Sequence, residues 1–309
     1  MKIEETKIKT DDNVELFLMK WLPDDKNAVK GVVQLSHGMA EHISRYGDFA
    51  SFLAESNFAV FGNDHRGHGK TAGSLENVGF FAEENGWELV VDDMHLISKL
   101  IKKEYPNVPV FTLGHSMGSF LCRHFMILYG NEINGAILSG TSGDPGFLGT
   151  MGMGVAKLAS FFKGKKALSP IMDALSFGSF NKGFKPAKTK FDWLSRDEAS
   201  VQKYIDDPYC GGIFSSGFFQ DMLRGIKFIN KKENIAKIPK DLPIYIFSGE
   251  KCAVGKNTKG VMEVANSFIN AGIKDVSHKI YKDARHEMLN ETNKKEVYSD
   301  VLNWLNAHI

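Results

Sequence analysis

The sequence contains 309 residues, of which 43% are hydrophobic and 24% charged, and its 38 basic and 37 acidic side chains give a net charge of +1. This length allows one large domain, or a core domain that carries an insertion. The balance of charge argues against nucleic acid as a partner and against strong attraction to anionic lipid.

Three cysteines, Cys122, Cys210 and Cys252, lie far apart and form no CxxC pair. This spacing argues against a disulfide framework and against a zinc site, and it is typical of a reducing compartment. The first residues carry charges and predict no signal peptide. No stretch reaches the roughly 18 apolar residues of a membrane span. We therefore expect a cytoplasmic protein.

Strands and helices alternate along much of the chain. In the first half, strands are predicted at residues 14–21, 31–36, 58–62, 110–113 and 136–139, and helices at 46–55, 89–104 and 116–129. The alternation returns near the C-terminus, with strands at 242–248 and 276–281 and helices at 258–271 and 296–308. This order predicts an α/β fold whose mostly parallel sheet is covered on both faces by helices.

The alternation stops between residues 143 and 230, a segment rich in Gly, Phe, Met and Lys. We interpret it as an inserted helical cap, so the core comprises residues 1–142 and 231–309. Apolar side chains of the cap would suit an acyl chain, although a place in the cap's own core is favoured for most of them. These side chains are Phe147, Leu148, Met151, Met153, Phe161, Phe162, Phe177, Phe180, Phe184, Phe214, Phe218 and Phe219.

The strongest local signal is the run Gly114-His-Ser-Met-Gly118, which follows the pattern G-x-S-x-G. It lies between an apolar strand and an amphipathic helix, the context in which this pattern presents a nucleophilic serine. The flanking positions need glycine because strand and helix pass closely at a strained turn. We predict that Ser116 is a nucleophile; the alternative is a plain glycine-rich turn.

A second loop, Ser36-His-Gly-Met39, follows the buried strand at 31–36. A loop of this kind supplies one backbone N–H to an oxyanion, and the residue after the nucleophile supplies the other. The expected donors are the backbone N–H groups of Met39 and Met117. For His37 we favour a role in packing the turn.

The general base is expected at His286, in the loop between the last strand and the C-terminal helix. A histidine in the final loop completes the chain order serine, acid, histidine. The sequence has ten histidines, so the assignment of His286 depends on its position just after the last predicted strand. His65, His68 and His115 are interpreted as turn or packing residues.

Taken together, these segments resemble the monoacylglycerol lipase and lysophospholipase group of α/β hydrolases, also known as the serine aminopeptidase S33-like family. The resemblance covers nearly the whole chain and implies the α/β-hydrolase fold, but it does not specify a substrate. The matching segments are His37-Gly-Met-Ala-Glu-His-Ile-Ser-Arg-Tyr46, Asp64-His-Arg-Gly-His-Gly69, Gly114-His-Ser-Met-Gly118 and Ala284-Arg-His-Glu287.

The sequence departs from the family at the acid of the triad. The resemblance implies a catalytic aspartate after the strand at 242–248, in a pattern like G-x-x-D-P-V-G. Here the stretch is Gly249-Glu-Lys-Cys-Ala-Val-Gly255, with Cys252 at the aspartate position. Three explanations stay open: Cys252 acts as a thiolate beside protonated His286, Asp144 or Glu250 replaces the aspartate, or the triad is broken.

Two functions follow from these residues. The first is a serine hydrolase that forms an acyl-enzyme; the resemblance implies monoacylglycerol or lysophospholipid esters as substrates, with no metal or organic cofactor. The second is a ligand-binding homologue with impaired catalysis, which Cys252 motivates. Either would bind a small molecule or a lipid ester and no nucleic acid, with at most peripheral membrane contact through the cap at Lys163, Lys165 and Lys166. The oligomeric state does not follow from the sequence.

Overall fold

The computed structural model describes the backbone of all 309 residues and every side chain except that of Leu148, which therefore lies outside the described cap residues. Eight strands form one sheet in the order β1-β2-β4-β3-β5-β6-β7-β8. The pairs β1–β2 and β2–β4 are antiparallel, and every pair from β4 to β8 is parallel. The strands are β1 (Lys2–Lys9), β2 (Glu15–Leu22), β3 (Gly31–Ser36), β4 (Phe58–Asn63), β5 (Val110–His115), β6 (Gly135–Ser139), β7 (Ile244–Gly249) and β8 (Val276–Tyr281).

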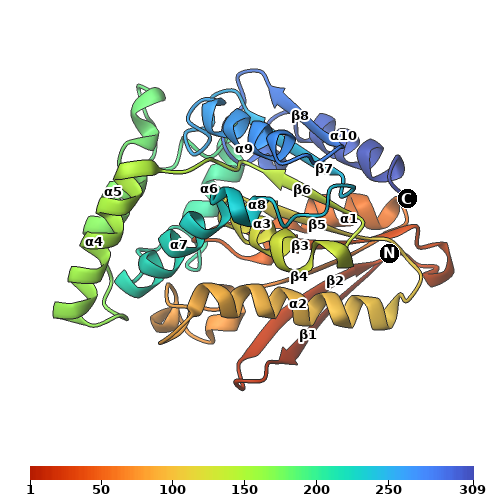
Figure 1. Cartoon of the computed structure of the whole chain (residues 1–309), viewed down its shortest axis with the longest axis horizontal. Coiled ribbons are helices and arrows are strands. Elements are labelled where there is room, and N and C mark those ends of the chain that lie inside the picture. Colours follow the sequence, from red (N-terminus) through yellow and green to blue (C-terminus); the bar gives the residue numbers. More distant parts are fainter.

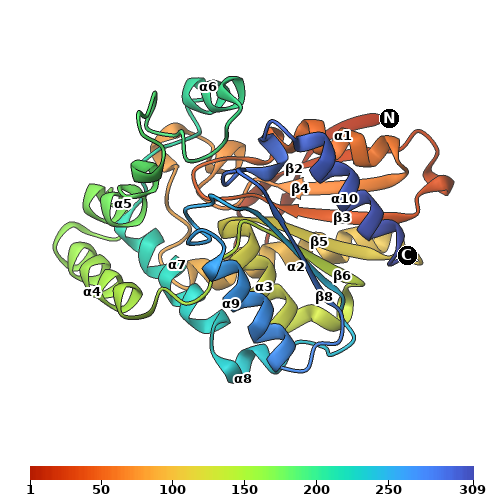
Figure 2. The same cartoon turned by 90° about the horizontal axis from the view of Figure 1, so that it is seen from above.

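Helices cover both faces of this sheet, as the alternation of elements predicts. Phe49 and Val301, from α1 and α10, belong to the apolar cluster on one face, while Ile97, Phe125 and Phe268, from α2, α3 and α9, belong to the cluster on the other. Figures 1 and 2 show the resulting layers. The helices are α1 (Gly47–Glu55), α2 (Gly86–Glu104), α3 (Met117–Tyr129), α4 (Gly146–Lys163), α5 (Pro170–Phe177), α6 (Glu198–Asp206), α7 (Ser216–Ile229), α8 (Lys232–Ile235), α9 (Lys259–Asn270) and α10 (Lys294–Asn306).

Strand β1 is absent from the sequence-based expectations. Most of its side chains are exposed, and five of its eight residues are charged: Lys2, Glu4, Glu5, Lys7 and Lys9. It pairs with β2 through its backbone at the edge of the sheet. Charged side chains are common on edge strands because they discourage pairing with other chains, and they also hide the apolar alternation that predicts a strand.

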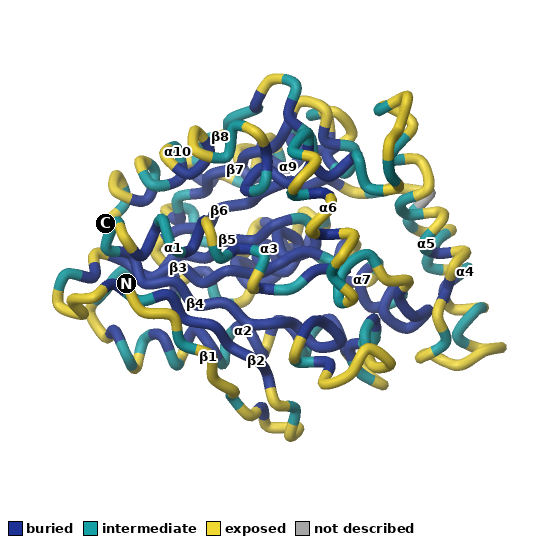
Figure 3. The backbone as a smooth tube through the Cα atoms, turned by 180° about the vertical axis from the view of Figure 1, so that it is seen from behind, coloured by how far each residue is buried: buried dark blue, intermediate teal, exposed yellow. Residues whose placement is uncertain are grey.

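The segment expected as the cap is helical and runs from the end of β6 to the start of β7. Helix α7 packs on α2 and α3 of the core and on α4 of the cap, and its Phe218 and Phe219 are fully buried. Helices α4 and α5 lie beyond α7, at the end of the molecule away from the sheet (Figure 1). The exposed stretches of α4 and α5 contrast with the buried strands in Figure 3.

Part of the expected cap core is exposed instead. Phe147, Phe161 and Phe162 on α4 are 76%, 81% and 74% exposed, and Met151 is 52% exposed. The expectation that most apolar cap residues pack inside the cap is therefore wrong for this helix. The physical reason is that α4 packs on α7 and α5, and the side chains on its face away from these two helices have nothing to pack against.

Both ends of the cap converge on one buried arginine of the core. Arg123 on α3 is 1% exposed, and its guanidinium donates to the carbonyl of Ser142 at 2.8 Å and to the side-chain oxygen of Asn230 at 2.7 Å. No carboxylate lies within hydrogen-bonding distance of this side chain in the described residues. Burial lowers the pKa of Arg123 to about 9. The cap thus leaves and re-enters the core at two points held by a single side chain.

Among the described residues, no helix combines the length and the apolar character that crossing a bilayer requires.

Candidate active site

Ser116 occupies the turn between β5 and α3 in a backbone conformation that side chains other than glycine rarely adopt. Its φ is +51° and its ψ is −118°, which costs free energy that the surrounding packing must offset. A methyl group on Gly114 would clash with the carbonyl of Gly118, and one on Gly118 would clash with the carbonyl of Ser36. Glycine at both positions therefore lets the strands and α3 approach closely enough to hold the serine in this conformation.

His286 lies in the loop after β8 and is 2% exposed. Its ring centroid is 4.5 Å from that of His115 and 5.2 Å from that of Trp193, a residue of the cap. Burial, with a smaller contribution from His115, holds the pKa of His286 well below its usual value. The imidazole is therefore neutral at pH 7, the form in which a histidine accepts a proton.

Ser116 follows β5 and His286 follows β8, and the residues at the carboxyl end of β6 lie between them. The backbone N–H of Ser116 donates to the carbonyl of Ser139 at 2.9 Å, and the next residue, Gly140, lies against the His286 ring, where a Cβ would come within 2.9 Å of its Cε1 atom. No hydrogen bond joins Ser116 Oγ to His286 in the described residues. Such bonds are often long in the absence of substrate and shorten when it binds.

Cys252 lies next to His286 after the end of β7. Its Sγ atom is 3.1 Å from His286 Nδ1 and accepts the N–H of Gly255 at 3.3 Å. The side chain is fully buried, and burial raises the pKa of the thiol. The sulfur is therefore a neutral thiol, which opposes the thiolate explanation for this position.

The two alternative acids are placed elsewhere. Asp144 is exposed and its carboxylate accepts the N–H of Gly146 at 2.7 Å. Glu250 is exposed and its carboxylate accepts the N–H of Asp283 at 3.0 Å. Both carboxylates shape local turns, and neither forms a hydrogen bond with His286 in the described residues.

The backbone N–H groups of Met39 and Met117, the expected oxyanion donors, have no protein acceptor in the described residues. The N–H of Met117 is free because it opens α3, where the first N–H groups have no acceptor within the helix. The N–H of Gly38 is not free, since it donates to Glu41 Oε1 at 2.6 Å. Ser116 Cβ lies close to this loop, 3.3 Å from the position that a Cβ of Gly38 would occupy.

His37 holds the loop that carries Met39. The backbone N–H of His65 donates to His37 Nε2 at 2.9 Å, which leaves the ring proton on Nδ1, and Nδ1 lies 2.7 Å from the carbonyl oxygen of Gly38. Burial, with smaller contributions from His65 and His68, lowers the pKa of His37 well below its usual value, so the ring stays neutral.

A buried ion network, to which the sequence analysis assigns no role, joins the two loops of the site. Arg45 Nη1 lies 2.5 Å from Glu41 Oε2, and Arg45 Nη2 lies 2.7 Å from Glu287 Oε2. Burial alone would raise the pKa of Glu287, but Arg45 lowers it below its usual value. Glu41 follows the loop of Met39 and Glu287 follows His286, so the network fixes these loops to each other. Glu41 and Arg45 lie in the family segment at 37–46 and Glu287 lies in the one at 284–287, but only the fold brings the three side chains together.

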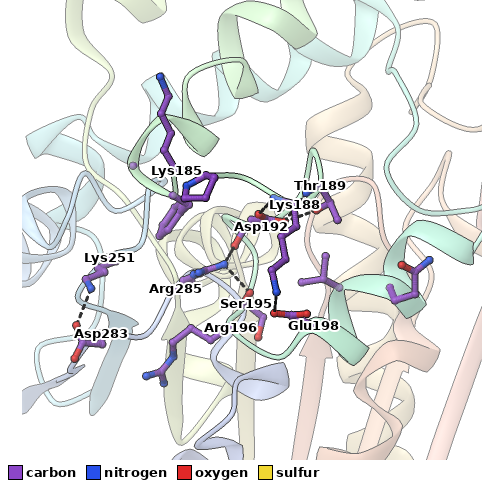
Figure 4. A pocket seen from close by; sticks show the side chains of 15 residues that line it. Lys185, Lys188, Thr189, Asp192, Ser195, Arg196, Glu198, Lys251, Asp283 and Arg285 are labelled. Carbon is purple, nitrogen blue, oxygen red and sulfur yellow. Dashed lines mark hydrogen bonds and ion pairs between the residues drawn. The ribbon is translucent and has the colours of Figure 1, made fainter.

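A cavity of about 640 Å³ opens between cap residues 183–202 and the loops at Lys251 and Asp283. Figure 4 shows its labelled side chains, most of which are charged or polar, with Lys188 and Glu198 paired and Arg285 reaching the backbone of Asp192. Neither Ser116 nor His286 lines it. A polar cavity separated from the serine does not suit an acyl chain, which needs apolar walls.

Comparisons with known proteins identify the family of the chain. Residues 27–293 match the family described as serine aminopeptidase, S33. The chain belongs to this family. The monoacylglycerol lipase of Mycolicibacterium smegmatis is 25% identical over 295 residues, with 94% of this chain and 92% of the relative covered. The monoglyceride lipase of Rattus norvegicus is 27% identical over 304 residues, with coverage of 96% and 88%.

Solved structures of family members and related hydrolases share the α/β-hydrolase fold. A thermostable carboxyl esterase from Bacillus coagulans in complex with glycerol superposes with a TM-score of 0.91 at 28% identity, covering 100% of this chain and 99% of the esterase. A soluble variant of the monoglyceride lipase of Saccharomyces cerevisiae, in complex with a substrate analog, has a TM-score of 0.78 at 22% identity, with coverage of 100% and 96%. The latter similarity shows the fold alone.

Proposed function

We propose that this member of the S33 family hydrolyses lipid-type carboxylic esters, of the monoacylglycerol or lysophospholipid class, through an acyl-enzyme. The observation that carries the proposal is the strained Ser116 at the start of α3, beside two free backbone N–H groups and a buried, neutral His286. The relatives named monoglyceride lipases support the lipid class of substrate.

In the proposed mechanism, Ser116 Oγ attacks the ester carbonyl while His286 Nε2 takes the hydroxyl proton. The N–H groups of Met39 and Met117 donate to the oxyanion of the tetrahedral intermediate. His286 then returns the proton to the departing alcohol, which leaves Ser116 acylated. Water attacks the acyl-enzyme with the same base and releases the fatty acid.

Cys252 weakens this mechanism for a physical reason. A carboxylate only accepts hydrogen bonds, so it holds the histidine proton on Nδ1 and leaves Nε2 free as a base. A neutral thiol both accepts and donates, so it also permits the tautomer in which Nε2 carries the proton. The thiol also lacks the negative charge that stabilises the imidazolium. Loss of this function from a serine protease costs about 10⁴ in kcat.

A ligand-binding role with impaired catalysis is the second candidate, and the neutral Cys252 thiol is the observation that favours it. In this case lipid esters bind at the site but are hydrolysed only slowly. The hydrolase role remains the stronger proposal because the strained serine and the free N–H groups, which a ligand-binding protein does not need, are both in place.

We further propose that the cap contacts lipid surfaces. Its outer helices expose Phe147, Phe161, Phe162, Ile171 and Leu175, each more than 60% exposed. Lysines at 163, 165 and 166 lie at the end of α4, next to two of these phenylalanines. An apolar surface bordered by lysines is typical of a protein that rests on a membrane surface, where monoacyl lipids reside. The free cysteines Cys122, Cys210 and Cys252 support a cytoplasmic location.

Ester turnover tests the proposed function. The chain should hydrolyse p-nitrophenyl esters and a monoacylglycerol, and Ser116→Ala should abolish both activities while the circular dichroism spectrum and melting temperature stay unchanged. Thr141→Ser, a buried change close to the site that leaves the serine intact, serves as the matched control. Equal turnover by the Ser116→Ala variant would disprove the assignment of the nucleophile.

A further inference from the structure

Three side chains with metal-ligating atoms converge at the seam between cap and core. His42 follows the loop of Met39, whereas Asp207 and Cys210 belong to the cap segment after α6. One ligand atom from each lies within 4.8 Å of the others. The two segments are docked at this point, since the backbone N–H of Gly211 donates to the carbonyl of Ala40 at 3.0 Å.

Neighbouring hydrogen bonds aim these side chains at a common point. His42 Nδ1 lies 2.7 Å from Ser44 Oγ, which leaves Nε2 directed at Asp207 Oδ2, 2.8 Å away. The other carboxylate oxygen of Asp207 accepts the N–H of Tyr209 at 2.9 Å. The carbonyl of Asp207 accepts the N–H of Cys210 at 3.0 Å. This turn brings the Cys210 side chain near the Asp207 carboxylate. In the described residues the sulfur itself has no hydrogen-bond partner.

The charges around the cluster favour a cation. The arginine that acts on both Asp207 and Cys210 is Arg45, which is already paired with Glu41 and Glu287. Asp207 therefore adds a negative charge to a region where two carboxylates outnumber one guanidinium. The side chains of His42 and Asp207 are 14% and 30% exposed, so solvent and an ion can reach them.

We propose that His42 Nε2, Asp207 Oδ2 and Cys210 Sγ bind a divalent transition-metal ion of the Zn²⁺ class, with water as the fourth ligand. Imidazole and thiolate ligands select Zn²⁺ over Mg²⁺ and Ca²⁺, which prefer oxygen. Bond lengths of about 2.0–2.3 Å would separate the ligand atoms by more than the 2.8 Å between Nε2 and Oδ2. The ion thus replaces the His42–Asp207 hydrogen bond. Burial raises the pKa of the Cys210 thiol, so the thiol releases its proton to solvent only as the metal–sulfur bond forms.

The hydrogen bond of the other ring nitrogen of His42 also fits a metal ligand. A histidine that binds metal through one nitrogen donates its other N–H to a neighbouring oxygen, which fixes the ring. Ser44 Oγ provides that acceptor for His42 Nδ1. An ion at this position would fasten the cap segment at 207–211 to the loop that carries Met39, one of the proposed oxyanion donors. The site does not depend on Ser116 or His286, so it stands apart from the proposed ester hydrolysis.

Metal binding by the full chain tests the site. Titration with Co²⁺ should give one equivalent of bound ion with a thiolate-to-cobalt charge-transfer band, and Zn²⁺ should displace it. Both Cys210→Ser and His42→Gln should abolish the band and weaken Zn²⁺ binding at least tenfold. His308→Gln, which alters another histidine–aspartate pair (3.0 Å from Asp275), is the matched control and should bind as the unaltered chain does.

Alkylation mapped by mass spectrometry identifies the cysteine without any variant. Zn²⁺ should protect Cys210 from alkylation and leave the modification of Cys122 and Cys252 unchanged. The proposal is overturned if Co²⁺ gives no charge-transfer band, if Cys210→Ser binds as tightly as the unaltered chain, or if protection falls on Cys252, which lies beside His286.

Discussion

At the scale of single residues, the proposed hydrolysis depends most on the thiol beside His286. Cys252 Sγ lies 3.1 Å from His286 Nδ1, a position from which a carboxylate would fix the tautomer and stabilise the imidazolium. We expect Cys252→Asp to raise kcat by about 10²–10⁴, the upper bound being the cost of losing the carboxylate from a serine protease. Steady-state kinetics on p-nitrophenyl butyrate measures the change.

The pH dependence of kcat/KM shows whether the charge or the shape of the side chain at position 252 matters. Burial lowers the pKa of His286, so the activity of the unaltered chain should persist below the usual histidine pKa of about 6.5. A carboxylate at 252 should raise that pKa and move the acidic limb of kcat/KM to higher pH. Cys252→Asn introduces a side chain of the same shape as aspartate but without its charge, and it should produce neither effect. Asp144→Asn and Glu250→Gln should leave kcat unchanged. A tenfold loss in either of the last two would identify the acid instead.

Short motifs made several of these residues predictable. The elbow pattern and the loop positions led to Ser116, His286 and the proposed oxyanion donors, because each motif places its functional atom through local backbone geometry. The ion network of Arg45 and the cluster around Cys210 were not predictable in this way. Each of them joins two segments that lie 165 or more residues apart, and the spacing of the cysteines alone argued against a metal site.

At the scale of elements, Arg123 controls how the cap is attached. Its guanidinium bonds to Ser142 before α4 and to Asn230 after α7. Arg123→Met should leave these acceptors unpaired and lower the free energy of unfolding by about 1–3 kcal/mol. Hydrogen exchange should rise at residues 141–146 and 228–232 together. Arg224→Met, which removes an exposed salt bridge to Glu88, is the control. A rise in exchange at only one of the two segments would contradict the claim that Arg123 holds both.

Helix α4 provides the test of lipid contact. Replacing both Phe161 and Phe162 by Ser should reduce sedimentation with phosphatidylcholine–phosphatidylserine vesicles severalfold, because both side chains are more than 70% exposed and bury apolar area only on contact with lipid. Turnover of a water-soluble ester should stay unchanged. Phe218→Leu, a buried change on α7, controls for general effects on the cap. Equal vesicle binding by the double variant would exclude α4 as the contact surface.

The alternation of strands and helices predicted the core elements well, but edges and surfaces less well. Helix α2 begins at Gly86, three residues before the predicted start, because Trp87 packs into the core. Strand β1 gave no apolar signal, since it lies at the edge with most of its side chains in solvent. The exposed face of α4 was not predictable either, because composition does not tell whether a phenylalanine faces a partner helix or water.

At the scale of the whole molecule, buried histidines should limit stability in acid. Burial lowers the pKa of His65 to about 3 and that of His68 to about 4. Below the unfolded pKa of about 6.5, the unfolded chain binds protons that the folded chain refuses, so the free energy of unfolding falls as pH decreases, by about 1.4 kcal/mol per pH unit for each such histidine. The stability is fully present above pH 6.5.

Urea unfolding between about pH 6 and pH 5 measures this loss, in a range above the ordinary pKa of carboxylates. His68→Gln should reduce the pH dependence by about 1 kcal/mol per pH unit, whatever its effect on stability at neutral pH. His308→Gln, at a partly exposed position, should change it less. A pH dependence that is the same in the His68→Gln variant would show that this histidine is protonated in the folded state.

The central claim is that the fold activates Ser116 as a nucleophile despite the thiol at position 252. Reaction of the full chain with a fluorophosphonate, followed by peptide mapping, tests it most directly, because a stable adduct forms only on an activated serine and needs no deacylation. We predict a single adduct on Ser116, formed more slowly after His286→Ala and absent from Ser116→Ala. A chain that forms no adduct, or forms it on another residue, would contradict the account.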